Sequence, residues 1–391
     1  MEKLKVTLKL DENSSLIVGG SKLANNYISS KDYIQGSVIR AAFARKILDM
    51  CPVDRKRLQK EKRNWIEPLE QEACKDCCYK TICEKFSDIK FSFFYPVETW
   101  VTPLTSKICK MDKSHGFIDL LTQDDVCAKC GKRVEFVEGL RTKEGRFKAT
   151  RLVQTKTAIN PYTQTARDGQ LFNLESIVDL SFEGEIENIT PEEIKMFRNL
   201  RVGAYTSTGY GKCILEISGE NIEVEKTFDK VSAYSKSYKQ NLLKLYIQDQ
   251  LASKEQEQVL RKQFEKEHLN KKYIVLLLTA DLRVHLPEKQ LNPQQDYKAM
   301  WYEALDLPMK QDVKIKDVYF DTRIYRGYDT SKNGDDYRAE MYYQISKGGI
   351  IVLEVSGDFK ACYEAYKKGI TLGLDTINGY GKCEIYCGEE V

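Results

Sequence analysis

Two groups of cysteines in the first half of the chain have spacings that suit metal coordination. Cys127 and Cys130 form a Cys-x-x-Cys pair, and Gly131 frees the turn after it, so both thiolates can reach one ion. Cys109 and His115 lie upstream at a plausible reach. Thiolates and an imidazole in a set of four are the ligands of a structural zinc ion. The sequence therefore predicts a tetrahedral zinc site of Cys109, His115, Cys127 and Cys130.

The second group contains Cys74, Cys77, Cys78 and Cys83. The adjacent pair cannot easily serve one tetrahedral ion together, so Cys74, Cys77 and Cys83 are the candidate ligands. Either Cys51 completes their shell, or the group shares a single site with the Cys-x-x-Cys pair. The alternative is that these thiols are reduced, metal-free and packed. No ordered run of four suitably spaced cysteines indicates an iron–sulfur cluster.

A glycine-rich segment occurs twice in the chain. Residues 203–213, the first loop, read GAYTSTGYGKC, and residues 373–383, the second loop, read GLDTINGYGKC. A phosphate loop of ATP-binding proteins runs from strand to helix and has a glycine separated by four residues from its Gly-Lys pair. Here a helical pattern precedes each loop, Thr206 and Thr376 take that glycine's place, and no Ser or Thr follows the lysine. ATP binding by that route is therefore excluded.

The chemistry that remains for the two loops is contact with RNA. Glycines let backbone N–H groups approach a phosphate chain, a lysine neutralises it, and a tyrosine stacks on a base or sugar. A tight turn with a buried tyrosine would explain one copy alone, but two matched copies favour RNA contact by at least one. The candidate contacts of the first loop are Gly209, Tyr210, Gly211 and Lys212. Those of the second loop are Tyr380 and Lys382, unless that loop faces a partner subunit.

Basic residues elsewhere add further candidate contacts. Ser37 is predicted to cap a helix, and Ser37 and Arg40 would bind a phosphate at its N-terminus. Arg151, Lys156 and Arg167 lie on or near a predicted hairpin and are candidates to clamp an RNA strand. Residues 129–156 contain nine Lys or Arg against three Glu. The net charge of the whole chain is only +3, so a nucleic-acid surface must be a local patch of this kind.

Composition and patterning also limit the class of protein. The chain has 391 residues, enough for two or three domains. Its N-terminus alternates like a strand, and its longest apolar run, 273–278, is far too short to cross a bilayer. We expect a soluble, cytoplasmic protein without a membrane partner. In such a protein 12 cysteines indicate metal binding or burial rather than disulfides.

The elements that would position these residues form two α+β units. Predicted strands at 4–10, 147–157, 171–182 and 213–217, with helices after residue 36 and at 191–200, give a β-α-β-β-α-β order, the ferredoxin-like or RRM-like arrangement. This unit spans 1–225 and carries a cysteine-rich, zinc-binding insertion at about 51–133. A charged helical linker follows at 226–270. A second ferredoxin-like unit, 271–391, has predicted strands at 272–280, 318–325, 338–345 and 350–355, the last two as a hairpin, and helices at 299–305 and 359–369.

Taken together, these motifs resemble the RAMP superfamily of CRISPR effector proteins. The resemblance rests on VGG at 18–20, YIQGSVIR at 33–40, DGQLF at 168–172 and the two glycine loops, and runs along most of the chain. The cysteine-rich insertion is similar to that of the double-domain RAMP subunit of type III-D systems.

The resemblance implies a subunit of an RNA-guided surveillance complex in antiviral defence. Such a subunit would bind crRNA at the repeat-derived 5′ handle, beside other RAMP subunits and the large polymerase-like subunit. It would meet target RNA indirectly, because base pairing by the guide supplies the specificity. The resemblance also adds Gly19 and Gly20 to the RNA contacts.

Two other functions stay open at this point. Some RAMP proteins are endoribonucleases that process crRNA or cut target RNA, and they need a general base. Asp32 and His285 are the catalytic candidates, because His115 lies among the cysteines and His268 ends a charged helix. The third function is a zinc-dependent nucleic-acid-binding protein outside CRISPR, which leaves the duplicated loops unexplained. We expect a binding subunit rather than an enzyme.

Overall fold

The computed structural model describes residues 3–19, 22–23, 27–51, 53, 66, 72–218, 226–250, 254–285, 297–328 and 338–388. Gly20, one of the predicted RNA contacts, lies outside these residues. Within them, helices combine with several small sheets. The described helices include none with the length and apolar character needed to cross a membrane.

The first unit is built around an antiparallel sheet with the order β15-β16-β1-β14-β4. Its strands are β1 (Lys3–Leu10), β4 (Lys90–Phe91), β14 (Ser181–Glu187), β15 (Asn199–Arg201) and β16 (Lys212–Ile217), and β5 (Tyr95–Pro96) also pairs with β14. The central strand β1 alternates, so Val6 and Leu8 are buried while Lys9 is exposed. This alternation fixes the face of the sheet that receives the helices.

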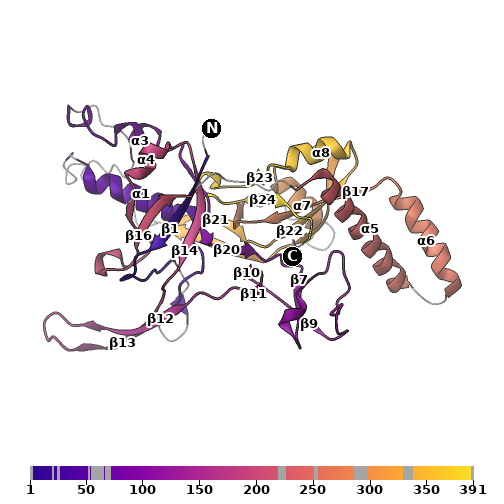
Figure 1. Ribbon diagram of the computed structural model, residues 1–391, viewed down its shortest axis with the longest axis horizontal. Helices are drawn as coiled ribbons and strands as arrows, with labels where there is room; N and C mark the ends of the chain where they lie inside the picture. Colours follow the sequence, from indigo (N-terminus) through magenta and orange to yellow (C-terminus); the bar gives the residue numbers. More distant parts are fainter. Residues whose placement is uncertain are drawn as a thin grey trace.

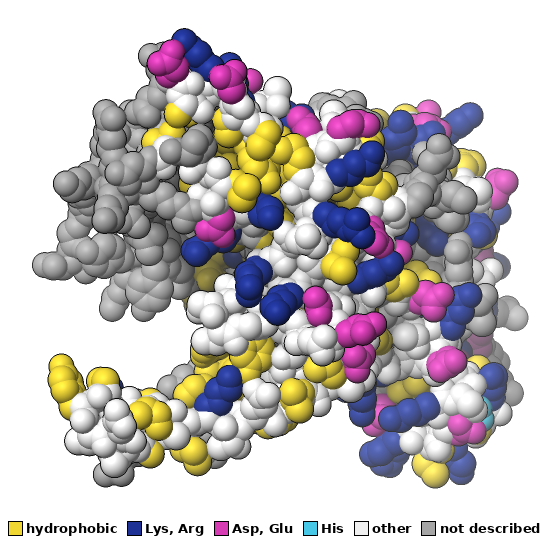
Figure 2. Space-filling view, turned by 60° about the vertical axis from the view of Figure 1, so that its left-hand side comes forward, with side chains coloured by type: hydrophobic (Ala, Val, Ile, Leu, Met, Phe, Trp, Pro, Cys, Tyr) yellow, Lys and Arg dark blue, Asp and Glu magenta, His cyan; other side chains and the backbone are white. Residues whose placement is uncertain are grey.

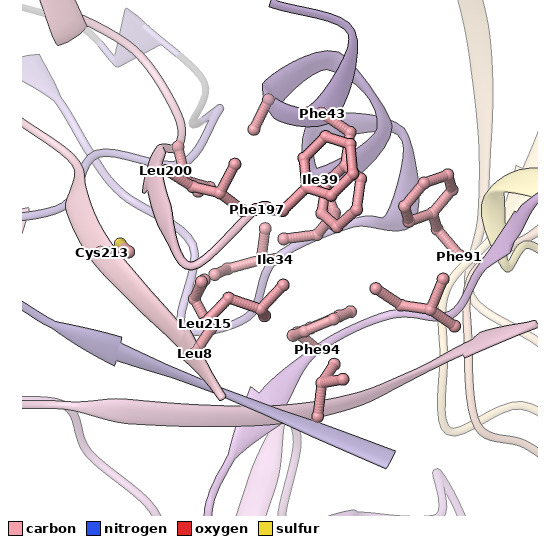
Figure 3. Close-up of a cluster of buried hydrophobic side chains, with 14 of the residues drawn as sticks. Leu8, Ile34, Ile39, Phe43, Phe91, Phe94, Phe197, Leu200, Cys213 and Leu215 are labelled. Carbon is pink, nitrogen blue, oxygen red and sulfur yellow. The ribbon is translucent and has the colours of Figure 1, made fainter. Parts of the chain in front are cut away.

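Three helices cover that face and close the first core. They are α1 (Gly36–Met50), α3 (Lys80–Lys85) and α4 (Pro191–Lys195). Phe43 of α1 stacks on Phe197 with 4.1 Å between ring centroids and meets Phe91 of β4 edge-on at 5.1 Å (Figure 3). Thr190 and Glu193 form a capping box at the start of α4, which fixes the chain just before Phe197.

The second unit repeats this arrangement with the order β19-β22-β17-β24-β23. Its elements are β17 (Lys272–Leu278), α7 (Tyr297–Ala304), β19 (Val313–Tyr319), β22 (Ile350–Val355), α8 (Phe359–Tyr366), β23 (Ile370–Thr371) and β24 (Lys382–Ile385). In each unit the strand that enters first, β1 or β17, lies in the centre of the sheet. In each unit the glycine loop connects the short edge strand, β15 or β23, to the last strand, β16 or β24. The sequence duplication thus corresponds to a structural one.

A smaller sheet accompanies each unit. In the first unit it has the order β12-β13-β3-β2, and in the second β18-β21-β20. The strands are β2 (Lys22–Leu23), β3 (Tyr27–Ile28), β12 (Arg151–Ile159), β13 (Ala166–Ile177), β18 (Leu282–Val284), β20 (Thr322–Tyr328) and β21 (Arg338–Ile345). The hairpin of β12 and β13, here called the arm, extends away from the body at the lower left of Figure 1.

The cysteine-rich region and the linker helices lie beside the second unit. Their elements are β6 (Trp100–Val101), β7 (Ser106–Cys109), β8 (Phe117–Asp119), β9 (Val134–Phe136), β10 (Leu140–Thr142), β11 (Gly145–Arg146), α5 (Phe228–Gln250) and α6 (Lys254–His268). Helix α5 packs on β17, where Tyr238 meets Tyr273 edge-on at 5.0 Å. Asn241 of α5 donates hydrogen bonds to the carbonyl oxygens of Leu120 and Leu121. Helix α5 therefore holds the cysteine-rich region against the second sheet.

Several expectations about the elements are wrong in detail. The partner of β14 in the first sheet is supplied by β4 and β5, inside the range assigned to the insertion, whereas 147–157 and most of 171–182 belong to the arm. A strand of two residues is too short to show an alternation of apolar and polar side chains, whereas the long strands of the arm show one.

In the second unit, the predicted strand 318–325 is divided between β19 and β20, and β21 and β22 lie in different sheets. Ser37 lies in the first turn of α1 rather than at its N-cap, which is Gln35. The domain boundaries stay a prediction.

Candidate functional site

Four side chains of the cysteine-rich region form one compact group. Cys109 ends β7, His115 ends a short 3-10 turn (Lys113–His115), and Cys127 and Cys130 lie in one tight turn. Their ligand atoms all lie within 4.8 Å of one another. The Sγ atoms of Cys109 and Cys130 are 3.6 Å apart, and Cys127 Sγ lies 3.3 Å from His115 Nδ1. The prediction that these four residues form one group that could hold a metal ion is confirmed.

The surroundings of this group favour ligation. His115 turns Nδ1 toward the thiols and Nε2 toward Asp112 Oδ2, 3.5 Å away, and a carboxylate behind a histidine commonly orients a metal ligand. A hydrogen bond from the backbone of Asp112 lowers the pKa of Cys109. Burial opposes ionisation of Cys127, but hydrogen bonds from the backbone of Cys130 and Lys129 and from the side chains of Cys130 and His115 lower its pKa to about 6. Thiolates are the form that binds zinc.

The second cysteine group differs from the first. Cys74, Cys77 and Cys83 are half-buried, and Cys78 is exposed. Cys77 and Cys83 pack against the core of the first unit. Burial and the neighbouring thiols, with Cys77 first, raise the pKa of Cys83 to about 11. Of the residues that the structure describes, only the Cys109 group brings its ligand atoms so close together.

The two glycine loops have the same backbone. Each contains a 3-10 turn, Thr206–Thr208 or Thr376–Asn378, between two left-handed residues, and the first of these is Tyr205 or Asp375. Gly211 and Gly381 have positive φ, and a Cβ there would lie 1.9 Å from the carbonyl oxygen of Val202 or 1.8 Å from that of Leu372. Only glycine fits these positions, which explains why both loops have a glycine there.

The second loop contacts the first unit of the same chain. Arg40 of α1 donates through Nε to Asn378 Oδ1 at 2.7 Å, and its other donors reach carbonyl oxygens of Phe86 and Ile89. Lys382 Nζ lies 3.1 Å from Glu185 Oε2 of β14. Burial opposes the charge of Lys382, but Glu384 and Glu185 raise its pKa. The predicted RNA contacts Arg40 and Lys382 thus join the two units of the chain.

Tyr380 and Ser37 lie in the same contact. The ring of Tyr380 is fully buried, and the guanidinium of Arg283 lies 3.7 Å from its centroid. Phe93 meets the ring edge-on at 5.0 Å, and Ser37 hydrogen-bonds its hydroxyl. A ring enclosed in this way offers no face for a base to stack on.

Gly36, at the start of α1, is the closest point between the first unit and the second loop. A Cβ there would lie 2.3 Å from the carbonyl oxygens of both Asn378 and Phe91. We predict that Gly36→Ala destabilises the protein by about 1–3 kcal/mol, because backbone atoms on both sides must move. Gly19→Ala is the matched control, since no atom lies within 4 Å of its added Cβ. Urea unfolding of the two variants checks this, and equal stability would contradict it.

A buried carboxylate that the sequence analysis missed lies between the two units. Asp281 is 3% exposed and accepts hydrogen bonds from Tyr33 and Gln35 of the first unit and from Gln344 and the backbone N–H of Lys347 of the second. Burial lowers the pKa of Lys347, whose Nζ lies 3.9 Å from the centroid of the Tyr33 ring. The signal in the sequence was an aspartate three residues after the apolar strand β17.

The first loop, in contrast, faces solvent on one side. No atom lies within 4 Å of a Cβ built on Gly209, and Lys212 is exposed. Tyr210 is 7% exposed, and its hydroxyl donates to Gln154 of the arm. Lys156 Nζ lies 4.6 Å from the centroid of the Tyr210 ring. The loop therefore separates two surfaces, one beside the arm and one beside α1.

The arm carries the other basic candidates. Arg151 is held at its base by Asp32, Glu175 and the carbonyl oxygen of Ser30. Arg167 is exposed. Large apolar side chains are exposed along the arm, and Tyr162 at its tip is 95% exposed. In Figure 2 hydrophobic side chains line the arm, and on the face above it Lys and Arg lie among Asp and Glu.

The two catalytic candidates lie in different surroundings. Asp32 pairs with Arg151. His285 is exposed and follows β18. His115 belongs to the cysteine group, and the ring of His268 stacks on Phe264 at 4.0 Å.

A scan against protein-family profiles finds no match, and a search of the curated proteins finds none either. Among solved structures, this chain is similar to chains of CRISPR complexes. One is from the type III-B Cmr-beta complex bound to cognate target RNA and AMPPnP, with 10% identity, a TM-score of 0.39, and coverage of 89% of this chain and 86% of that chain. Another is from Cmr-beta bound to cognate target RNA, with 10% identity, a TM-score of 0.37, and coverage of 93% and 94%.

A third is from a type IV-B CRISPR complex, with 10% identity, a TM-score of 0.26, and coverage of 58% of this chain and 96% of that chain. TM-scores below 0.5 do not establish a common fold.

Proposed function

We propose that this chain is a non-catalytic, crRNA-binding subunit of a type III CRISPR effector complex, similar to the double-domain RAMP subunit of type III-D systems. The observation that carries the proposal is the duplicated glycine loop, which connects the same two strands in two sheets of the same strand order. Each unit would be a ferredoxin-like domain, with its first strand in the centre of an antiparallel sheet and its helices on one face. The protein would act in the cytoplasm with crRNA, other RAMP subunits and the large polymerase-like subunit.

The surface for the guide lies beside the arm. There Lys156 stands next to the first loop, Tyr205 is 39% exposed, and Tyr162 and Arg167 extend along the arm. Basic side chains interleaved with exposed aromatic rings suit the backbone and bases of single-stranded RNA. Gly19 precedes this sheet and leaves open space for a close approach. The repeat-derived 5′ handle is the part of crRNA that we assign to this surface.

Zinc fits the Cys109 group. The donor set is three sulfurs and one imidazole nitrogen, which is a structural rather than a catalytic set because no position is left for water. The ion would hold β7, the 3-10 turn and the Cys-x-x-Cys turn together. The described residues carry no comparable set for the Cys74 group.

The function is tested by purifying the tagged protein from its host, with sequencing of bound RNA and mass spectrometry of bound proteins. Mature crRNAs with a common 5′ handle, together with other RAMP subunits, are the expected result. Unprocessed repeat transcripts without partners would instead indicate a processing nuclease. The absence of any CRISPR-derived RNA would overturn the proposal and leave a zinc-binding protein of another function.

Lys156→Glu is predicted to weaken crRNA binding by about tenfold and to lower the salt dependence of log K by about one unit, because one phosphate contact is lost and a repulsion is added. Lys262→Glu is the matched control, because it makes the same charge change at an exposed position on α6. Filter binding over a series of salt concentrations measures both. If Lys156→Glu and Lys262→Glu bind crRNA equally well, crRNA does not contact Lys156.

A further inference from the structure

Two half-buried lysines meet where the first unit joins the second. Lys31 precedes α1, and Lys347 lies in the turn between β21 and β22. Their ammonium groups lie 5.4 Å and 3.9 Å from the centroid of the same ring, that of Tyr33, which is 8% exposed. We call Lys31 and Lys347 the lysine pair. Two like charges beside one buried ring repel each other, so an anion bound between them would stabilise the arrangement.

The protein does not neutralise the lysine pair. Burial lowers the pKa of both lysines, and Asp281, the carboxylate that acts on both, opposes this only in part. Asp281 accepts its hydrogen bonds from neutral side chains and a backbone N–H, and not from either ammonium group. Within the described residues neither lysine has an ion-pair partner. Two positive charges against one carboxylate leave an excess of one, which is the charge that a phosphodiester carries.

The other carboxylates near the lysine pair already have partners. They form three ion pairs, which are Asp32 with Arg151, Asp321 with Arg323, and Asp375 with Arg283. Arg323 adds to the repulsion, since its charge also lowers the pKa of Lys31 and of Lys347. A half-buried charge without a partner is costly for a folded protein, so an excess of this kind indicates a site for an anionic ligand.

A sheet face with basic and aromatic side chains begins beside the lysine pair. Arg283, Gln344 and Arg323 lie side by side across β18, β21 and β20, and Gln344 donates to Asp281. Tyr325 and Tyr342 follow two residues along β20 and β21, on the same face, with 5.1 Å between ring centroids. Tyr325 is 43% exposed. Arginines beside an exposed aromatic ring suit the phosphates and bases of single-stranded RNA.

This face is the counterpart of the surface beside the arm. In each unit a cation of the small sheet covers the tyrosine of the glycine loop. Lys156 lies 4.6 Å from the ring centroid of Tyr210, and Arg283 lies 3.7 Å from that of Tyr380. The two faces also meet, because Asp32, the neighbour of Lys31 in the sequence, pairs with Arg151 at the base of the arm. The lysine pair therefore lies between the two faces.

We propose that the lysine pair binds a phosphodiester of an RNA strand that passes from the surface beside the arm to the face of β18, β21 and β20. Both ammonium groups would donate to the phosphate oxygens, and Tyr325 would offer its ring to a base beyond them. The inference rests on the proposed function, because the strand would be the crRNA. The repeated cation-covered tyrosine favours RNA over an acidic protein, since its first copy borders the surface assigned to RNA.

Lys347→Met tests the site, because it removes the charge and keeps the length of the side chain. Lys314→Met is the matched control, at an exposed lysine of β19. Filter binding over a series of salt concentrations measures the affinity for crRNA and for an unrelated single-stranded RNA of the same length. Lys347→Met is expected to weaken the binding of both RNAs about tenfold and to lower the salt dependence of log K by about 0.7 unit, because one phosphate contact is lost. Lys314→Met should bind like the wild-type protein.

Melting curves of the RNA-free proteins separate binding from folding. A lysine that holds a half-buried charge for a ligand does not stabilise the empty protein, so Lys347→Met should melt at the wild-type temperature or above it. A lysine with a structural role would lower the melting temperature when replaced. A variant that melts earlier, or one that keeps its RNA affinity and salt dependence, would overturn the site.

Further comparisons identify the ligand. A wild-type protein that does not prefer crRNA removes the proposed function alone, and weaker binding of both RNAs by Lys347→Met still supports the site. Equal losses on crRNA with a 5′-phosphate and with a 5′-hydroxyl support a phosphodiester, whereas a loss confined to the 5′-phosphate form would overturn that assignment. Unchanged RNA affinity with a lower recovery of partner subunits from the host would show that the lysine pair binds an acidic protein and that the inference is wrong.

Discussion

Replacing Cys127 with serine is expected to release the zinc ion and unfold the region that surrounds it. Cys127 is 2% exposed, and its Sγ lies 3.3 Å from the imidazole of His115. Structural zinc in small zinc fingers stabilises the folded state by about 10 kcal/mol or more, and the short strands of this region have little core of their own. We expect the zinc content to fall from about one ion per chain to nearly none.

The loss of structure in Cys127→Ser should extend to α5, which packs on the second unit. Asp119 and Leu121 lie between the ligands in sequence and contact α5, where Tyr234 donates to Asp119. Hydrogen exchange should therefore rise in residues 106–137 and in α5. Zinc analysis and melting curves with and without a chelator measure the main effect.

Cys78→Ser serves as the control for Cys127→Ser, because Cys78 is exposed and lies outside the ligand group. It should leave the zinc content and the melting temperature unchanged. Replacement of zinc by cobalt provides a separate readout, since tetrahedral thiolate ligation gives absorption bands that Cys127→Ser should abolish. A Cys127→Ser protein that keeps both its zinc and its stability would exclude the proposed ligand set.

Asp281→Ala should produce the second large effect, which is a loss of contact between the two units. The substitution leaves Tyr33, Gln35, Gln344 and the backbone N–H of Lys347 without their common acceptor. A buried donor without a partner costs about 1–3 kcal/mol, so a total of about 3 kcal/mol or more is expected. The melting temperature should fall by about 6–12 °C. Unfolding of the variant should also separate into two transitions, one for each unit.

Asp321→Ala tests whether the effect belongs to the buried position. Asp321 is also a carboxylate of the second unit, and it accepts from Ser346 at 2.9 Å, but its side chain is 48% exposed. Its loss should cost less than about 1 kcal/mol. Equal destabilisation by the two substitutions would show that Asp281 does not join the units.

The sequence predicted those parts of the site that depend on short-range spacing. The ligands of the Cys109 group lie close together in the sequence. A glycine that is required at a position of positive φ can be recognised when the motif occurs twice, as with Gly211 and Gly381. The partners of Arg40 and Lys382 lie 338 and 197 positions away, so their role as internal contacts could not be read from the neighbouring residues. A basic side chain that awaits RNA and one that pairs with a distant carboxylate have the same sequence.

The same limit explains why the burial of Tyr380 and the strands that pair with β14 could not be predicted from neighbouring residues. A tyrosine in a turn can stack on a base or fill a core, and only the fold shows that Tyr380 is enclosed by Arg283 and Phe93. Strands β4 and β5 have two residues each and are held by pairing with β14 rather than by a pattern of their own. The long strands of the arm alternate more clearly between apolar and polar residues, so the prediction assigned them to the first sheet instead.

The contact between the second loop and the first unit has a consequence for stoichiometry. Subunits that each offer two complementary surfaces can add to a row without limit, because every added member leaves one surface free for the next. In this chain the second loop already contacts the first unit, through Arg40 and Asn378 and through Lys382 and Glu185. The surfaces used in this contact are not available to a further subunit.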